Sequence, residues 1–163
     1  MPINDEPYPW IEIGRTLPDD RVVVQRDDLV VALTCVRALS YGFMFRLSII
    51  AAHELDPPAF DLPPDARRIA LTLKQTDTTG ITTVKKLQLQ GGGGSGSRYE
   101  YDFWAPVDNT AACATIWVRW PAERLPPTSV QFELRNIRAA AVNVLATTGT
   151  FALNAACPTA WAS

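Results

Sequence analysis

Residues 29–37 read LVVALTCVR and residues 43–52 read FMFRLSIIAA, and these two stretches decide the fold class. In the first stretch apolar side chains occupy both parities, which is typical of a strand covered on both faces. In the second, every other residue from Phe43 to Ile49 is apolar, so one face of a strand is predicted to be buried. Residues 40–42 between them read SYG and predict a hairpin turn, because glycine tolerates a positive φ.

The same two-residue alternation recurs along the chain. It predicts further strands at residues 10–13, 21–25, 68–73, 81–90, 98–104, 114–120 and 130–135, with turns at sites such as Leu125-Pro126-Pro127. Only residues 137–147, which are rich in alanine, suggest a helix. The sequence therefore predicts an all-β protein: an antiparallel two-sheet β-sandwich of about nine strands with one short C-terminal helix, formed as a single domain over residues 1–163.

Composition narrows the classes of partner and location. The formal net charge of −2 produces no field strong enough to gather nucleic acid or an anionic membrane. No apolar stretch is long enough for a membrane-spanning helix, and the first residues show no signal-peptide pattern. Cys35, Cys113 and Cys157 are widely spaced and form no CxxC pair. We therefore expect a cytoplasmic protein with three reduced thiols; a single disulfide remains open, although the spacing does not indicate it.

A glycine run occupies residues 91–97, which read GGGGSGS. A Walker A phosphate loop needs a lysine and a serine or threonine after its last glycine, followed by a helix, and neither is found here. We instead predict a flexible hairpin loop and take Gly91, Gly92, Gly93 and Gly94 as candidate binding residues. The composition is also that of a synthetic linker.

The segment after the glycine run alternates aromatic and acidic side chains. Tyr99 and Tyr101 share one predicted strand face, and Glu100 and Asp102 share the other. A stripe of carboxylates beside a mobile loop could recruit a basic partner or help bind a cation. The alternative is that the acidic residues are only the solvated face of the strand.

A second candidate surface lies on the predicted strand at residues 114–120. Trp117 and Arg119 share the parity that faces solvent and could stack as a cation–π pair. They could instead belong to a contact surface, because tryptophan and arginine are enriched at binding hot spots.

The sequence offers few groups for catalysis or metal binding. His53 is the only histidine; with Glu54 and Asp56 it supplies one nitrogen and two oxygen ligands, a weak metal signal beside the alternative of an exposed histidine at a strand end. No GxSxG motif occurs. The paired acids at residues 19–20 and 27–28 lie in predicted turns, so a carboxylate-dependent hydrolase stays a minor possibility. We predict no catalytic residue, no metal ligand and no cofactor.

The order of these features also resembles that of a known group of proteins. The segments that carry the resemblance are Asp27-Asp28-Leu29, Leu39-Ser40-Tyr41-Gly42-Phe43, the glycine run, Phe103-Trp104-Ala105-Pro106 and Trp120-Pro121-Ala122. Over roughly residues 20–142 the chain resembles a group of small uncharacterised actinobacterial proteins. The resemblance implies no activity, because no function is established for that group.

Together these observations favour a non-catalytic protein-interaction or self-association module, whose partner is another protein or a second copy. The alternative is a β-sandwich that binds a small ligand or a cation, with the glycine-rich loop as a lid.

Overall fold

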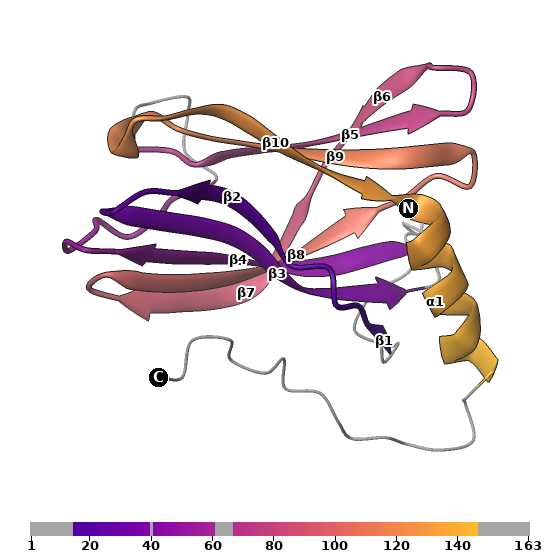
Figure 1. The fold of residues 1–163 in the computed structure, drawn as a ribbon, viewed down its shortest axis with the longest axis horizontal. Helices are drawn as coiled ribbons and strands as arrows, with labels where there is room; N and C mark the ends of the chain where they lie inside the picture. Colours follow the sequence, from indigo (N-terminus) through magenta and orange to yellow (C-terminus); the bar gives the residue numbers. More distant parts are fainter. Residues whose placement is uncertain (1–14, 40, 61–66, 147–163) are drawn as a thin grey trace, which may run out of the picture.

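The computed structural model describes residues 15–39, 41–60 and 67–146. In these residues two antiparallel sheets pack face to face and one helix lies at an end of the sandwich (Figure 1). The predicted all-β sandwich with a short C-terminal helix is thus confirmed. The strand predicted at residues 10–13 lies outside the described residues.

The larger sheet has six strands. They are β1 (Arg15–Thr16), β2 (Arg21–Gln25), β3 (Leu29–Leu39), β4 (Gly42–Ala51), β7 (Gln88–Ser95) and β8 (Arg98–Pro106). Their order is β1-β3-β4-β8-β7, and β2 pairs with β3 beside β1. The sheet therefore ends at β7 on one side and at β1 and β2 on the other.

The smaller sheet has four strands in the order β10-β9-β5-β6. They are β10 (Leu125–Glu133), β9 (Ala111–Trp120), β5 (Ala70–Asp77) and β6 (Thr82–Lys85). A short 3-10 turn, η2 (Pro121–Glu123), joins β9 to β10, and the helix α1 (Leu134–Ala146) follows β10. No helix in the described part of the chain is long and apolar enough to cross a membrane.

Aromatic side chains from both sheets fill the core. The rings of Phe43 and Phe132, on opposite sheets, lie 5.3 Å apart, and those of Phe45 and Phe103 lie 5.6 Å apart. The apolar parity of β4 faces this core, as the alternation predicts, and Ile137 of α1 packs against it. One continuous apolar interior therefore joins the two sheets and the helix.

A β-bulge interrupts β3 at Cys35. This residue has a φ of 54°, and the pairing of β3 with β4 shifts register between Thr34 and Arg37. The Cys35 amide donates a hydrogen bond to Oδ1 of Asp20 (3.1 Å), which holds the β1–β2 turn over the bulge. Cys35 is disulfide-bonded and Cys113 is free. The prediction of three reduced thiols is therefore wrong for Cys35.

Three segments differ from the sequence-based predictions. Residues 91–95 of the glycine run continue β7 instead of forming a loop. Residues 81–90, predicted as one strand, divide into β6 and β7, because the chain crosses from one sheet to the other at residues 86–87. The predicted turn at Pro126 and Pro127 lies within β10, where the pairing with β9 shifts register between Leu125 and Thr128. Proline is tolerated there because β10 is an edge strand.

Candidate functional site

The two flanks of the sandwich differ in how their edge strands are covered. On the first flank β10 packs beside β2. The guanidinium carbon of Arg21 in β2 lies 5.7 Å from the ring centroid of Phe132 in β10. Arg26, in the β2–β3 turn, donates a hydrogen bond to the carbonyl oxygen of Glu123 in η2 (3.0 Å). We call this side the closed flank.

The second flank carries β6 and β7, each at the end of its sheet. Within residues 15–39, 41–60 and 67–146, no strand pairs with the outer edge of either one. Three large apolar side chains are exposed here: Ile81 (63%), Val84 (66%) and Leu89 (42%). Unpaired strand edges beside exposed apolar side chains are a common docking surface for other chains. We call this side the open flank.

The glycine run forms the outer strand of the open flank because two of its members have no room for a side chain. A Cβ atom at Gly94 would lie 2.7 Å from Cα of Tyr99 and closer still to a backbone carbonyl of β8. A Cβ atom at Gly92 would meet the backbone of β8 in the same way, and Gly92 has a φ of +132°. At Gly91 a Cβ atom would meet nothing within 4 Å. The run therefore lets β7 lie close against β8.

The β7–β8 turn is also held in place. The amide of Ala51 donates to the carbonyl oxygen of Ser97 (2.8 Å), and the amide of Leu55 donates to that of Gly96 (2.9 Å). A turn fixed by two backbone hydrogen bonds, one from the end of β4 and one from the connection that follows it, is not a free lid. The prediction of a flexible loop across residues 91–97 is therefore wrong.

The predicted acidic stripe on β8 is compensated by arginines on the outer face of the sheet. Nε of Arg46 lies 2.8 Å from Oδ1 of Asp102, and its Nη1 lies 3.7 Å from Oε2 of Glu100. Glu100 also contacts Arg98 (3.3 Å). The hydrogen bond that Arg46 donates to Asp102 raises the pKa of the Arg46 guanidinium, with burial acting against it. These paired carboxylates leave little negative charge for a basic partner or a cation.

The tyrosines of β8 point into the sandwich and not toward solvent. Tyr99 is buried, and Tyr101 is half-buried with its ring 6.3 Å from that of Tyr99. The ring of Phe60 packs edge-on against Tyr101 (4.8 Å) and Phe103 (5.1 Å). Burial, followed by the proximity of Tyr99, raises the pKa of Tyr101. Tyr99 is therefore a core residue and drops out of the candidate binding surface.

Trp117 lies on the face of the smaller sheet that points away from the core, half-buried, with Arg119 exposed two residues along the strand. The cation over the Trp117 ring is Nζ of Lys74, 5.4 Å from the centroid. That contact comes from the neighbouring strand β5, so the predicted pairing with Arg119 is replaced by one across strands.

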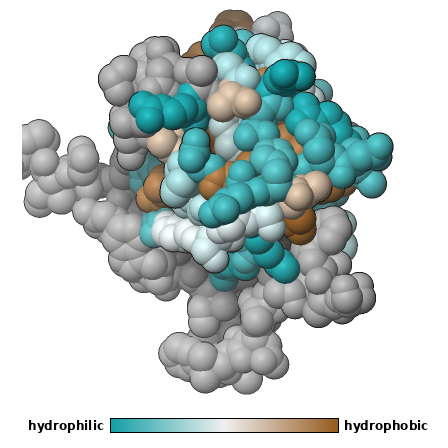
Figure 2. Space-filling view, turned by 90° about the vertical axis from the view of Figure 1, so that its left-hand side faces the viewer, coloured by the Kyte–Doolittle hydropathy of each residue, from teal (hydrophilic) through white to brown (hydrophobic). Residues whose placement is uncertain are grey.

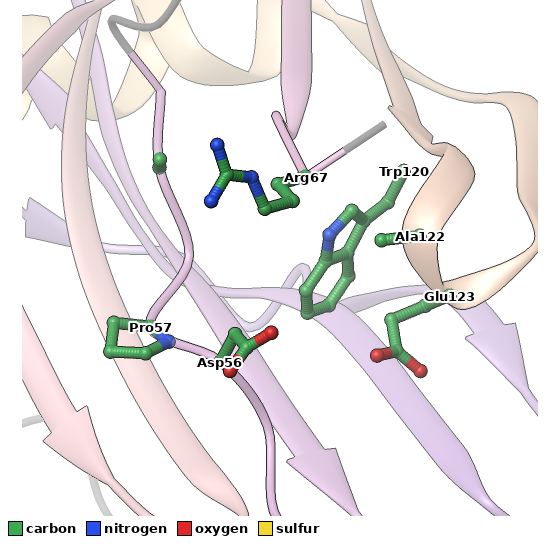
Figure 3. A pocket seen from close by; sticks show the side chains of 7 residues that line it. Asp56, Pro57, Arg67, Trp120, Ala122 and Glu123 are labelled. Carbon is green, nitrogen blue, oxygen red and sulfur yellow. The ribbon is translucent and has the colours of Figure 1, made fainter. Parts of the chain in front are cut away.

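A cavity of about 290 Å³ lies at the end of the sandwich that carries the β9–β10 turn. Figure 2 shows this end, where hydrophilic side chains predominate among the residues that are coloured by hydropathy. In Figure 3 the indole of Trp120 lies between the side chains of Arg67 and Glu123, and the carboxylate of Asp56 lies below. Charges of both signs beside an aromatic edge suit a small polar ligand.

The histidine lies next to this cavity. Nε2 of His53 is 3.1 Å from Oε2 of Glu123, a residue far away in sequence. His53 is an exposed residue just after β4, as the plainer interpretation of the sequence predicted. Among the residues that the structure describes, no three histidine, cysteine, aspartate or glutamate side chains lie close enough together to hold a metal ion.

The turn carboxylates serve local structure. Asp19 pairs with Arg21 (2.7 Å) and Asp28 with Arg26 (3.0 Å). Asp77 accepts hydrogen bonds at the start of the β5–β6 turn, and the Thr79 hydroxyl is the main cause that lowers its pKa. Carboxylates occupied in this way do not form the facing pair that glycoside hydrolysis needs.

The open flank was not predicted from the sequence, because the exposure of Val84 and Leu89 depends on the order of the strands. The absence of proline from residues 82–95 is the one feature of the sequence that indicates an unprotected strand edge here, and it is a weak indication. No protein-family model, curated protein or solved structure matches the chain. The resemblance to small actinobacterial proteins therefore remains a prediction.

Proposed function

We propose that the protein is a non-catalytic interaction module that binds a protein partner, or a second copy of itself, through the open flank. The observation that carries this proposal is the pair of edge strands β6 and β7, whose outer edges no described residue pairs with, and the exposure of Val84 and Leu89 beside them. An exposed sheet edge supplies main-chain hydrogen bonds to an added strand, and the neighbouring pockets select its side chains.

The other candidate surfaces support an interaction role less well. Lys74 already contacts the ring of Trp117, and Arg46 already forms ion pairs with Asp102 and Glu100. A group that is already paired inside the chain gains less free energy from a partner than an unpaired backbone edge does.

The experiment compares two matched variants as bait in an extract of the source cells. Val84→Glu places a charge on the open flank, and Val22→Glu makes the same change at a 54% exposed position on β2. We expect a specific set of proteins, or a second copy, to bind the wild type and Val22→Glu and to be lost with Val84→Glu. Quantitative mass spectrometry and sedimentation velocity measure the two cases. If nothing depends on Val84, the proposal fails.

A small polar ligand in the 290 Å³ cavity is the second candidate function, favoured by the mixed charges around Trp120. The exposed Ala122 lines this cavity, so Ala122→Trp would fill it. A thermal-shift screen of sugars, amino acids and nucleotides should give a stabilising compound whose effect is lost in Ala122→Trp and kept in Ala139→Trp on the exposed face of α1. A screen without such a compound counts against this candidate.

The cellular location is a separate proposal. The sequence favours the cytoplasm, but stable disulfides are rare there and common in oxidising compartments. Because Cys35 is disulfide-bonded, we propose an oxidising compartment in place of the cytoplasm. Fractionation of the source cells, with non-reducing peptide mapping of Cys35, tests this.

A further inference from the structure

A groove of about 220 Å³ opens on the open flank between the two sheets. Its walls come from both sheets, from the crossover at residues 86–87 and from the segments before β5. The lining residues are Phe60, Arg68, Ile69, Leu71, Thr72, Val84, Lys85, Lys86, Leu87, Leu89 and Phe103. None of these lining residues carries a carboxylate, so the groove is apolar inside and basic at its rim.

The floor of the groove is fixed by aromatic packing. Phe60 contacts the ring of Phe103 edge-on at 5.1 Å, and Phe103 is itself buried and stacked on Phe45. The rims of the groove are exposed where its floor is buried, because Val84 on β6 and Leu89 on β7 both reach the solvent. A rigid apolar floor between two exposed apolar rims suits one large side chain of a partner.

The outer strand can accept a backbone beside it. The peptide groups of an edge strand alternate in direction, so every second residue points its N–H and C=O away from the sheet. The exposed glycines of β7 carry no side chains that would obstruct an approaching strand. A strand added next to β7 would direct its inward side chains toward the groove.

The charge at the rim selects the kind of partner. Lys85 has a partner in Asp108 (2.7 Å), but Lys86 is exposed and forms no ion pair with any described residue. A second copy that docked through its own open flank would present the same basic lining without a carboxylate, which offers Lys86 no compensating charge. A segment with carboxylates would instead neutralise this charge.

We propose that the open flank binds an extended, acidic segment of another protein, which adds as a strand to β7 and places an apolar side chain between Val84 and Leu89. This inference rests on the proposed interaction function and deepens it, because it names the chemistry of the partner. It also selects between the two partners left open above: a different protein is favoured over a second copy.

The probes are two synthetic peptides that differ only in charge, acetyl-EVELEVE-amide and acetyl-KVKLKVK-amide. We expect the acidic peptide to bind the full chain at least about tenfold more tightly, and less tightly as salt is added. Amide resonances of residues 88–95 should shift in the NMR titration. Lys86→Glu should weaken binding of the acidic peptide by about tenfold. Lys74→Glu, with the same charge change on the outer face of β5, should leave the binding unchanged.

The outcomes separate this inference from the function on which it rests. If both peptides bind equally and shift residues 88–95, the acidic preference is overturned while the open flank stands as a docking surface. If neither peptide shifts these residues, strand addition to β7 is overturned, and the bait comparison of Val84→Glu with Val22→Glu then decides separately whether the flank binds proteins. Dimerisation that Val84→Glu abolishes overturns the choice of a foreign partner.

Discussion

The closed flank and the open flank both carry strands at the edge of a sheet, but only the closed flank protects its edges from an added strand. On the closed flank, Pro126 and Pro127 remove N–H donors from β10, and register shifts occur in both β2 and β10. On the open flank β6 and β7 contain no proline, and their edges are unpaired in the described part of the chain. The pairing of β7 with β8 also shifts register, between Leu89 and Gly91, so the two flanks differ in proline and not in bulges. Because proline is a usual protection against added strands, its absence from β6 and β7 indicates where a partner can bind.

The largest expected difference between the flanks is in their contribution to stability. Phe132, on the closed flank, is fully buried and packs against Phe43, so Phe132→Ala should lower the free energy of unfolding by about 3–5 kcal/mol. Phe60, under the open flank, is only half-buried, so Phe60→Ala should cost about 1–2 kcal/mol. Urea unfolding followed by tryptophan fluorescence measures both. Equal losses would mean that the open flank is as much a part of the core as the closed one.

The sequence was sufficient for the strands that carry apolar runs or an apolar alternation. The prediction for β2 matches its bounds, and β3 and β4 begin within one residue of the predicted positions, because one face of each strand packs in the core. The glycine run was not predicted as a strand, since four glycines have no hydropathy pattern and the close approach of Gly94 to Tyr99 is visible only in three dimensions. Prediction thus worked where burial leaves a period in the sequence.

The candidate site was harder to predict for the same reason. Tyr99 and Asp102 were predicted as binding residues from their residue types alone. In the structure Tyr99 packs in the core, and Asp102 pairs with Arg46 from the neighbouring strand. The groove depends on Leu71 and Leu89, which belong to different sheets. Residue type alone does not reveal which strands end a sheet.

The next-largest expected effect is the loss of stability when the disulfide at Cys35 is reduced. Cys35 lies where β3 exchanges β2 for β1 as its partner, on the closed side of the larger sheet. Reduction should lower the free energy of unfolding by about 2–4 kcal/mol. The measurement is urea unfolding of a Cys113→Ser variant with and without reductant. A Cys35→Ser chain should not respond to reductant, and identical curves for the Cys113→Ser variant would contradict the prediction.

A smaller effect is expected from the two glycines that differ in the space around them. Gly94→Ala should push β7 away from β8 and cost about 1–3 kcal/mol, because the added methyl group collides with the backbone near Tyr99. Gly91→Ala meets nothing within 4 Å and is the matched control. Hydrogen exchange of the β7 and β8 amides measures the loosening. If the two variants exchange alike, the run is not required for close packing of the edge.

The smallest effect is a pH response at the tip of the open flank. The Asp77 carboxylate accepts hydrogen bonds from the hydroxyl of Thr79 (2.6 Å) and the amide of Ile81 (2.9 Å), and these contacts lower its pKa below the ordinary 3.8. A carboxyl whose pKa is lower in the folded state stabilises the β5–β6 turn above its unfolded pKa. That stabilisation is lost as the pH falls through the folded value. The Ile81 amide proton should therefore titrate with a midpoint below 3.8 and stay constant in Asp77→Asn. A midpoint at or above 3.8 would mean that these hydrogen bonds do not hold the turn in solution, so the β5–β6 hairpin that carries Val84 would be less ordered than the groove needs.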